Sequence, residues 1–293
     1  MEGDRTLDLR IANAALSQLS YHPGEGGGFY RRSCAADNAS DIMAAMQITP
    51  PFGYKRIVPL RRDQKVRLPA PGEVPQFAHT LNAVPISFAE FAPAARDYPI
   101  VFTSGDNGNR FAAVAVLGLT SGENLFLDGD AWAKGVYCPA YVRRYPFCMA
   151  KVTLDKVEQQ NRLICVEADY AEGGAGEALF DDQGQPIEKW KGIERLITEY
   201  EADLERAREL CSILSDYGLL EPFTMQATFN QGGAMQLTGM HRAAEPKLET
   251  LNAAQLKNLL KKGILGRLYA HLISIENFAR LLDRRAARAA AAL

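Results

Sequence analysis

Apolar residues recur at steps of three and four along residues 188–217, which is the spacing of one face of an α-helix. Gly218 follows directly, and a glycine at this place typically ends a helix because it readily adopts the left-handed conformation. The same spacing predicts a second helix over residues 252–262, which Gly263 stops, and a third from about Ile264 to Leu282. The sequence therefore predicts one long central helix and a group of C-terminal helices.

Alternating apolar and polar positions predict two hairpins between extended segments. Residues 98–103 and 110–119 are separated by GDNGN, a run with the residues that hairpin turns prefer. Residues 221–242 alternate on both sides of a pair of glycines, Gly232–Gly233. Because side chains alternate across a strand, one face of this hairpin should carry Phe223, Met225, Ala227 and Phe229.

Two shorter elements complete the pattern. A third hairpin is expected over residues 177–187, with its turn at Asp182–Gly184. Ser87 followed by Glu90 three residues later is the spacing of a capping box, and it predicts the start of a short helix. Since hairpins precede helices and no βαβ alternation is seen, we predict an α+β fold with a mostly antiparallel sheet. The sheet is built from hairpins and packed by the long central helix and the C-terminal helices.

The ends of the chain differ from its middle. Residues 1–50 contain GEGGG and only short apolar periods, so we expect a flexible N-terminal extension with one short helix. Residues 51–285 are expected to form a single α+β domain, and residues 286–293 a frayed tail.

Composition excludes several classes of protein. The 293 residues carry a formal net charge of −2, which does not support binding to nucleic acid or to acidic membranes. The longest apolar run, near residues 111–119, is about half the length of a membrane-spanning helix. The first residues, MEGDRTLDLR, lack the apolar run of a signal peptide. We therefore expect a cytoplasmic protein without a membrane span, and export by a route that needs no signal peptide stays open.

Neither cysteine nor histidine spacing predicts a metal or cofactor. The five cysteines include no CxxC pair, which favours free thiols in a reducing compartment, and Cys148 and Cys165 lie in apolar, strand-like runs expected to be buried. The four histidines form neither HxH nor HExxH. The run Asp128–Asp130 resembles the start of a calcium loop, but Ala133 and Pro139 stand where that loop needs glycine and glutamate. We expect no metal and no cofactor.

The densest group of chemistry-bearing residues lies between Tyr137 and Phe147. Tyr141, Arg144 and Tyr145 have helical spacing and are expected to share a face, with Arg143 beside them. One interpretation is an anion site, because guanidinium groups match carboxylate or phosphate. The alternative is that both arginines pair with buried carboxylates while the tyrosines pack and donate hydrogen bonds.

Four further residues are candidates for a site. Glu123, beside Asn124, follows a strand and is expected either to pair with Arg143 or Arg144 or to act as a catalytic acid. Trp132 is expected to be a packing anchor, or a stacking platform if it is exposed. His271 lies beside the apolar stripe of the last predicted helix, where it is either a hydrogen-bonded boundary residue or part of a pocket.

Seven blocks in order resemble the bacterial SapC family, from about Tyr54 to Leu282. They are NAVPISFAEFAPAARDYPIVF, LGLTSGENLF, CPAYVRRYPF, EALFDDQGQP, LLEPFTM, LTGMHR and ILGRLYAHLISIENFARLL. The family is named after a protein encoded with surface-layer genes, so the resemblance implies a role linked to the surface layer or outer surface. It implies no catalytic residues and no cofactor, and an unrelated peptide-transporter permease shares the name.

Three hypotheses of function follow, of which one, a structural subunit of the surface layer itself, is disfavoured by the lack of a recognisable export signal. The first is a non-catalytic binding or accessory protein with a protein or peptide partner, which predicts an exposed apolar or aromatic surface. The second is an enzyme in which Tyr141, Arg143, Arg144, Tyr145, Glu123 and His271 converge on a pocket. The burial and the partners of the two arginines discriminate between them.

Overall fold

The computed structural model describes residues 6–7, 47–105, 108, 110–154, 157–172, 174, 176–228 and 234–291. Contacts divide the chain into two compact units. The first contains Ala70–Arg143 and Thr198–Leu293, and the second contains the segment that ends at Pro69 together with Arg144–Ile197. The extension predicted over residues 1–50 lies almost entirely outside the described residues, and the domain boundaries at residues 51 and 285 stay predictions.

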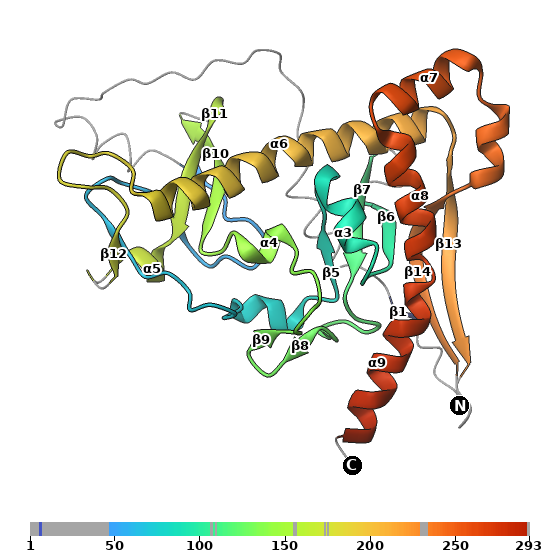
Figure 1. Ribbon diagram of the computed structural model, residues 1–293, viewed down its shortest axis with the longest axis horizontal. Helices are drawn as coiled ribbons and strands as arrows, with labels where there is room; N and C mark the ends of the chain where they lie inside the picture. Colours follow the sequence, from blue (N-terminus) through green and yellow to red (C-terminus); the bar gives the residue numbers. More distant parts are fainter. Residues whose placement is uncertain are drawn as a thin grey trace. The chain divides into compact units, whose positions relative to one another are not determined.

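The first unit is built around a six-stranded sheet (Figure 1). Its strands are β1 (Thr6–Leu7), β5 (Ala83–Pro85), β6 (Ile100–Ser104), β7 (Phe111–Val116), β13 (Leu220–Thr228) and β14 (Ala234–Ala243). Their order is β1-β14-β6-β7-β5, with β13 paired to β14, and the paired strands are antiparallel except for β1 and β14. A separate short ribbon joins β8 (Leu127–Asp128) and β9 (Ala131–Trp132).

The two long predicted hairpins of this unit are confirmed. Strands β6 and β7 pair across the predicted turn, with Val101 opposite Val114. Strands β13 and β14 also pair, and the turn between them lies outside the described residues. On β13 the side chain of Met225 is buried while its neighbours in sequence are exposed, as the alternation predicts. Phe229, predicted on the same face, lies outside the described residues.

The helices of the first unit follow the apolar periodicity. They are η1 (Gln76–Thr80), η2 (Phe88–Glu90), α3 (Phe91–Ala94), α4 (Ala140–Arg143), η3 (Glu245–Thr250), α7 (Ala253–Lys261), α8 (Ile264–Ser274) and α9 (Asn277–Ala291). Helix α8 contacts β6 and β14 and covers one face of the sheet (Figure 1). Asn252 caps α7, so the predicted helix over residues 252–262 is confirmed within one residue at each end.

The last predicted helix differs from the structure in two ways. The chain forms two helices, α8 and α9, because Ser274 Oγ donates to the carbonyl of His271 and Asn277 Nδ2 donates to the carbonyls of Ala95 and Tyr98. These side-chain bonds compete with the regular helical pattern at the junction. Helix α9 also continues to Ala291, beyond the expected end near Leu282.

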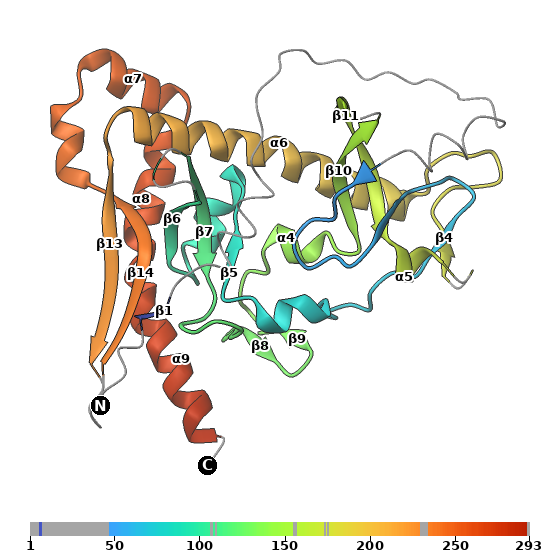
Figure 2. The same ribbon diagram turned by 180° about the vertical axis from the view of Figure 1, so that it is seen from behind.

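The second unit contains a four-stranded antiparallel sheet in the order β2-β10-β11-β3. Its elements are β2 (Gln47–Ile48), β3 (Ile57–Pro59), β4 (Lys65–Val66), β10 (Phe147–Leu154), β11 (Val157–Glu167), α5 (Ala168–Ala171), β12 (Glu177–Ala178) and the first residues of α6 (Glu188–Asp216). Strands β10 and β11 form a long hairpin (Figure 2). Trp190 of α6 packs with Phe147, Val166 and Leu179 in the core of this unit.

Helix α6 is the long helix predicted over residues 188–217, and Gly218, with a φ of 66°, follows its end as expected. The turn predicted within residues 177–187 is present, since the Gly184 N–H donates to the Asp181 carbonyl at 2.8 Å, but the flanking segments do not form two regular strands. Strand β12 pairs with β4, and the returning segment makes one isolated bridge, between Phe180 and Pro186. Hydrogen bonds from the Asp181 N–H to the Gln185 carbonyl and from the Ile187 N–H to the Leu179 carbonyl flank this bridge, and the pairing stops there because α6 begins at Glu188. The fold class is α+β with antiparallel sheets, as predicted.

Candidate functional site

A buried carboxylate holds the start of the YCPAYVRRYPF segment. Glu90, at the end of η2, is 3% exposed. Its Oε1 accepts from the Tyr137 hydroxyl at 3.0 Å and from the Ala140 N–H at 2.7 Å, and its Oε2 accepts from the Ser87 N–H at 2.9 Å. The contact with Ser87 is the predicted capping box, which is confirmed. Because three donors occupy both oxygens, Glu90 fixes the first residue of α4.

Arg143 joins the same network at the surface. Its Nε donates to the carbonyl of Cys138 at 2.9 Å, and a terminal nitrogen donates to the Tyr137 hydroxyl at 3.1 Å. Its guanidinium also lies 5.5 Å from the centre of the Tyr137 ring.

Burial raises the pKa of the Cys138 thiol to about 12, so this cysteine is protonated at neutral pH and is a poor nucleophile.

The predicted helical face is not formed, because α4 ends at Arg143. Tyr141 is 5% exposed and packs edge-on against Phe77, with ring centres 6.1 Å apart. Tyr141 belongs to the first unit, whereas Arg144 and Tyr145 belong to the second. The helical spacing of these three residues was therefore a misleading signal.

Arg144 and Tyr145 lie among aromatic rings of the second unit. Arg144 is 4% exposed, and its guanidinium lies 5.9 Å from the centre of the Tyr54 ring. The ring of Tyr145 lies 5.1 Å from Tyr54 and 5.2 Å from Tyr170, measured between centres. Burial raises the pKa of Tyr145, which keeps its hydroxyl protonated. Tyr145 thus has the packing role of the second interpretation, whereas the pairing of Arg144 with a buried carboxylate stays a prediction.

Trp132 is a packing residue with a satisfied N–H. Its Nε1 donates to the Tyr98 hydroxyl at 3.0 Å and to the Tyr137 carbonyl at 3.2 Å. The Tyr98 hydroxyl itself donates to the same carbonyl. This arrangement ties the β8–β9 ribbon to the segment before α4, as expected of a packing anchor.

His271 bridges two strands at the point where their direct pairing ends. Strands β6 and β14 pair at Phe102 and His241, but two residues further along each strand the imidazole of His271 lies between them. The Ala243 N–H donates to Nε2 at 3.0 Å, so Nδ1 carries the proton and donates to the Ile100 carbonyl at 2.8 Å. Burial lowers the pKa of His271 to about 4. This fully buried residue is neutral at pH 7 and structural.

The side chain of Glu123 stabilises the loop that follows β7 by accepting hydrogen bonds from its backbone. Its Oε2 accepts from the N–H groups of Leu119 at 2.8 Å and Thr120 at 3.1 Å. A side chain at Gly118 would place its Cβ 2.0 Å from the Glu123 carbonyl oxygen, so this tight turn requires glycine there. The ion-pair partner of Glu123 is Arg285, whose Nε lies 3.8 Å from Oε1, instead of the expected Arg143 or Arg144.

Asn124 connects this loop to η1. Its Nδ2 donates to the Ala78 carbonyl at 2.7 Å, and its Oδ1 accepts from the Phe126 N–H at 2.9 Å. The side chain is buried, and both of its polar atoms are used. Asn124 therefore fixes the backbone that forms one wall of the neighbouring cavity.

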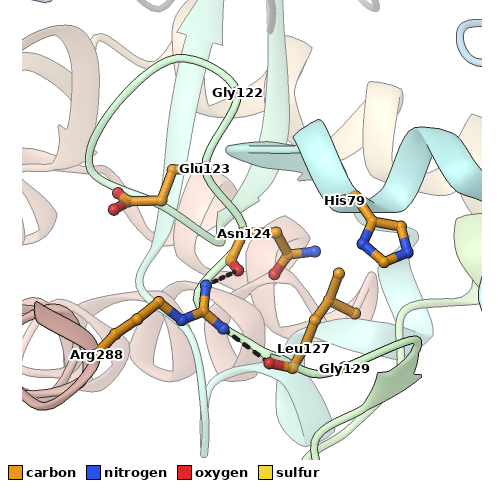
Figure 3. Close-up of a pocket in the computed structure, with 7 residues that line it drawn as sticks. All are labelled: His79, Gly122, Glu123, Asn124, Leu127, Gly129 and Arg288. Carbon is orange, nitrogen blue, oxygen red and sulfur yellow. Dashed lines mark hydrogen bonds between the residues drawn. The ribbon is translucent and has the colours of Figure 1, made fainter. Parts of the chain in front are cut away.

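A cavity of about 330 Å³ lies beside the loop (Figure 3). It is lined by His79, Gly122, Glu123, Asn124, Leu127, Gly129 and Arg288. Arg288 of α9 donates to the carbonyls of Asn124 and Leu127, both at 2.7 Å. Figure 3 shows the Glu123 and His79 side chains on opposite sides of Asn124. The cavity is thus polar and carries charges of both signs.

Sequence reasoning found part of this cavity. Glu123 and Asn124 were predicted site residues, whereas His79 and Arg288 were missed. Arg288 lies in the segment expected to fray, yet the spacing of Arg280, Arg284 and Arg288 by four residues was a signal that α9 continues. The remaining predicted residues are not among those that line the cavity: Trp132, Tyr141, Arg143, Arg144, Tyr145 and His271.

The cysteines and the possible metal ligands can be located in the described parts of the chain. There Cys138, Cys165 and Cys211 are free thiols, and Cys148 lies opposite Cys165 in the β10–β11 ladder with both side chains buried, as predicted. Burial raises the pKa of Cys165 and of Cys211 to about 12. Within these same residues, no group of three or more His, Cys, Asp or Glu side chains could hold a metal ion.

None of the helices that the structure describes combines the length and the apolar character needed to cross a bilayer.

Comparison with known proteins supplies the family. The family model described as SapC matches residues 64–281, which is most of the chain and nearly the region of the resemblance. Neither the curated proteins nor the solved structures include a match. The chain belongs to the SapC family.

Proposed function

We propose that this protein is a non-catalytic binding or accessory protein that docks a protein or peptide partner through α7 and α8. Four large apolar side chains on these helices face solvent: Leu256 is 39% exposed, Leu260 68%, Tyr269 42% and Ile273 67%. Leu256 and Leu260 are four residues apart in α7, and Tyr269 and Ile273 are four residues apart in α8, so the members of each pair share one face of their helix. Single exposed apolar residues are ordinary, but two such pairs on consecutive helices are typical of an interaction surface.

The charge of the same surface indicates the chemistry of the partner. Lys257 and Lys261 lie next to the two leucines in α7, and both lysines are exposed. Charge complementarity at an interface speeds association and disfavours partners of the wrong sign. We therefore propose a partner segment that combines apolar side chains with carboxylates, and the family name supports a surface-layer or outer-surface protein as its class.

The enzyme hypothesis has less support. Two N–H groups of Arg143 donate inside the fold, to the Cys138 carbonyl and to the Tyr137 hydroxyl. His271 uses both ring nitrogens on backbone groups. A general acid or base needs a proton-transfer atom within reach of a substrate, which His271 does not offer. Of the residues in this hypothesis, Glu123 lines the cavity and keeps one oxygen without a hydrogen bond, but none of the predicted arginines or tyrosines lines the cavity with it.

The test is binding by matched variants. Tagged wild type, the double variant Leu260→Gln/Ile273→Gln and the control Leu163→Gln would each be incubated with lysate of the native cell. Leu163 is 36% exposed but lies on β11 of the second unit. We expect wild type and control to retain a protein that the double variant does not retain. That protein, once purified, should bind the double variant at least about tenfold more weakly by calorimetry.

Two outcomes would contradict the proposal. One is equal affinity of the purified partner for all three forms. The other is a wild-type dimer in analytical ultracentrifugation that the double variant does not form, since the surface would then join two copies of this chain.

A further inference from the structure

We infer that the cavity lined by Arg288, Glu123 and His79 binds a small amphoteric molecule of the amino-acid type. This site is distinct from the docking surface on α7 and α8 and does not depend on it. The ligand carboxylate would bind the guanidinium of Arg288, and the ligand ammonium would bind Oε1 of Glu123.

Arg288 is held in place with donors to spare. Two of its N–H groups donate to the carbonyls of Asn124 and Leu127, and a guanidinium has five N–H groups in one plane. Among the described residues no carboxylate pairs with it, so its charge is not neutralised by an ion pair. A guanidinium that is fixed in this way can receive a carboxylate at low entropic cost.

Glu123 supplies the opposite charge on the same cavity. Its Oε2 is occupied by two backbone N–H groups, but its Oε1 lies 3.8 Å from Arg285 Nε, beyond hydrogen-bond distance. This oxygen retains its accepting capacity for an ammonium group. The loop bonds keep the carboxylate in position before any ligand arrives.

His79 and Leu127 complete the lining. The ring of His79 forms part of the wall, while its Nε2 atom is buried and has no hydrogen bond, with Asp130 Oδ1 3.5 Å away. Leu127 gives the lining an apolar part. A volume of about 330 Å³ is near the lower end of the usual range for ligand pockets, roughly 300 to 1,000 Å³, which suits a molecule of amino-acid size.

The experiment is calorimetry on the full chain with the common amino acids. For each amino acid that binds, two analogues are compared: one lacks the ammonium group and the other lacks the carboxylate. We expect at least one amino acid to bind with a dissociation constant at or below about 1 mM, and both of its analogues to bind at least about tenfold more weakly.

Matched variants locate the site. Glu123→Gln keeps an amide oxygen for the two backbone N–H groups while removing the charge, and Arg288→Gln removes the guanidinium. Each should weaken binding at least about tenfold. Arg280→Gln is the control, because Arg280 lies on the same helix and donates to the Arg96 carbonyl outside the cavity, and it should leave affinity unchanged. Circular dichroism verifies that each variant is folded.

Three results would overturn the inference. The first is that no amino acid binds to the wild type at about 1 mM. The second is binding that Glu123→Gln and Arg288→Gln leave unchanged. The third is that the analogue without the ammonium group binds as tightly as the amino acid, since the site would then bind simple carboxylates.

Discussion

The side chains of Glu90 and Glu123 both accept hydrogen bonds from backbone N–H groups, but they differ in how many of their carboxylate oxygens are occupied. Both oxygens of Glu90 are occupied by hydrogen bonds, and its side chain is buried. Glu123 uses one oxygen for its loop and leaves the other beside a cavity. The lesson is that a carboxylate becomes available to a ligand only when the surrounding donors do not occupy all of its acceptor sites.

Replacing each glutamate by glutamine tests this contrast, and Glu90→Gln should lower the free energy of unfolding more than Glu123→Gln. An amide has one oxygen, so its NH₂ group must face either the Ser87 N–H or the pair formed by Tyr137 and Ala140. One charge-assisted bond is lost and a buried donor is left unsatisfied. We expect the free energy of unfolding to fall by about 4 kcal/mol, measured by urea denaturation. A loss below about 1 kcal/mol would show that the network contributes little.

The neutral histidine between the strands should make stability depend on pH. The pKa of His271 is about 4 in the fold, against its usual value of 6.5, so on acidification the unfolded chain takes up a proton that the folded chain does not. This contribution is fully present above pH 6.5 and is lost as the pH falls towards 4. We expect a loss of about 3 kcal/mol between pH 7 and pH 4, measured by urea denaturation at each pH.

The variant His271→Gln serves as the control for this pH dependence. It should be less stable at pH 7 and should lack the part of the slope that the imidazole causes. Identical slopes in the variant and the wild type would contradict the assignment.

Glu123→Gln should have the smallest effect on stability. The amide oxygen can accept from Leu119 and Thr120, and the amide nitrogen takes the place of Oε1, which is not hydrogen-bonded to the protein. We expect a change in the free energy of unfolding of about 0.5 kcal/mol or less, from the same urea measurement. A loss as large as that of Glu90→Gln would remove the distinction between the two carboxylates.

Local patterns predicted much of the fold. The periodicity of α6 and its terminal Gly218, the β6–β7 turn and the Ser87–Glu90 capping box each depend on residues close together in sequence. What the sequence did not reveal depends on distant partners. His271 meets Ile100 across more than a hundred residues, and no spacing rule connects the two.

The candidate site was predicted less well for the same reason. Helical spacing grouped Tyr141 with Arg144 and Tyr145, but α4 ends at Arg143, so the three residues do not share a helical face. Glu123 was found from its turn context, yet Arg288, which lines the same cavity, lies on α9, more than 150 residues away in sequence. Only the packing of α9 against that loop brings the two side chains together.

The most direct test of the proposed function is hydrogen exchange on the complex with the captured partner. The account predicts slower exchange on binding in α7 and α8, over residues 253–261 and 264–274, and no change at Tyr137–Arg143. Protection at Tyr137–Arg143 with α7 and α8 unchanged would contradict it.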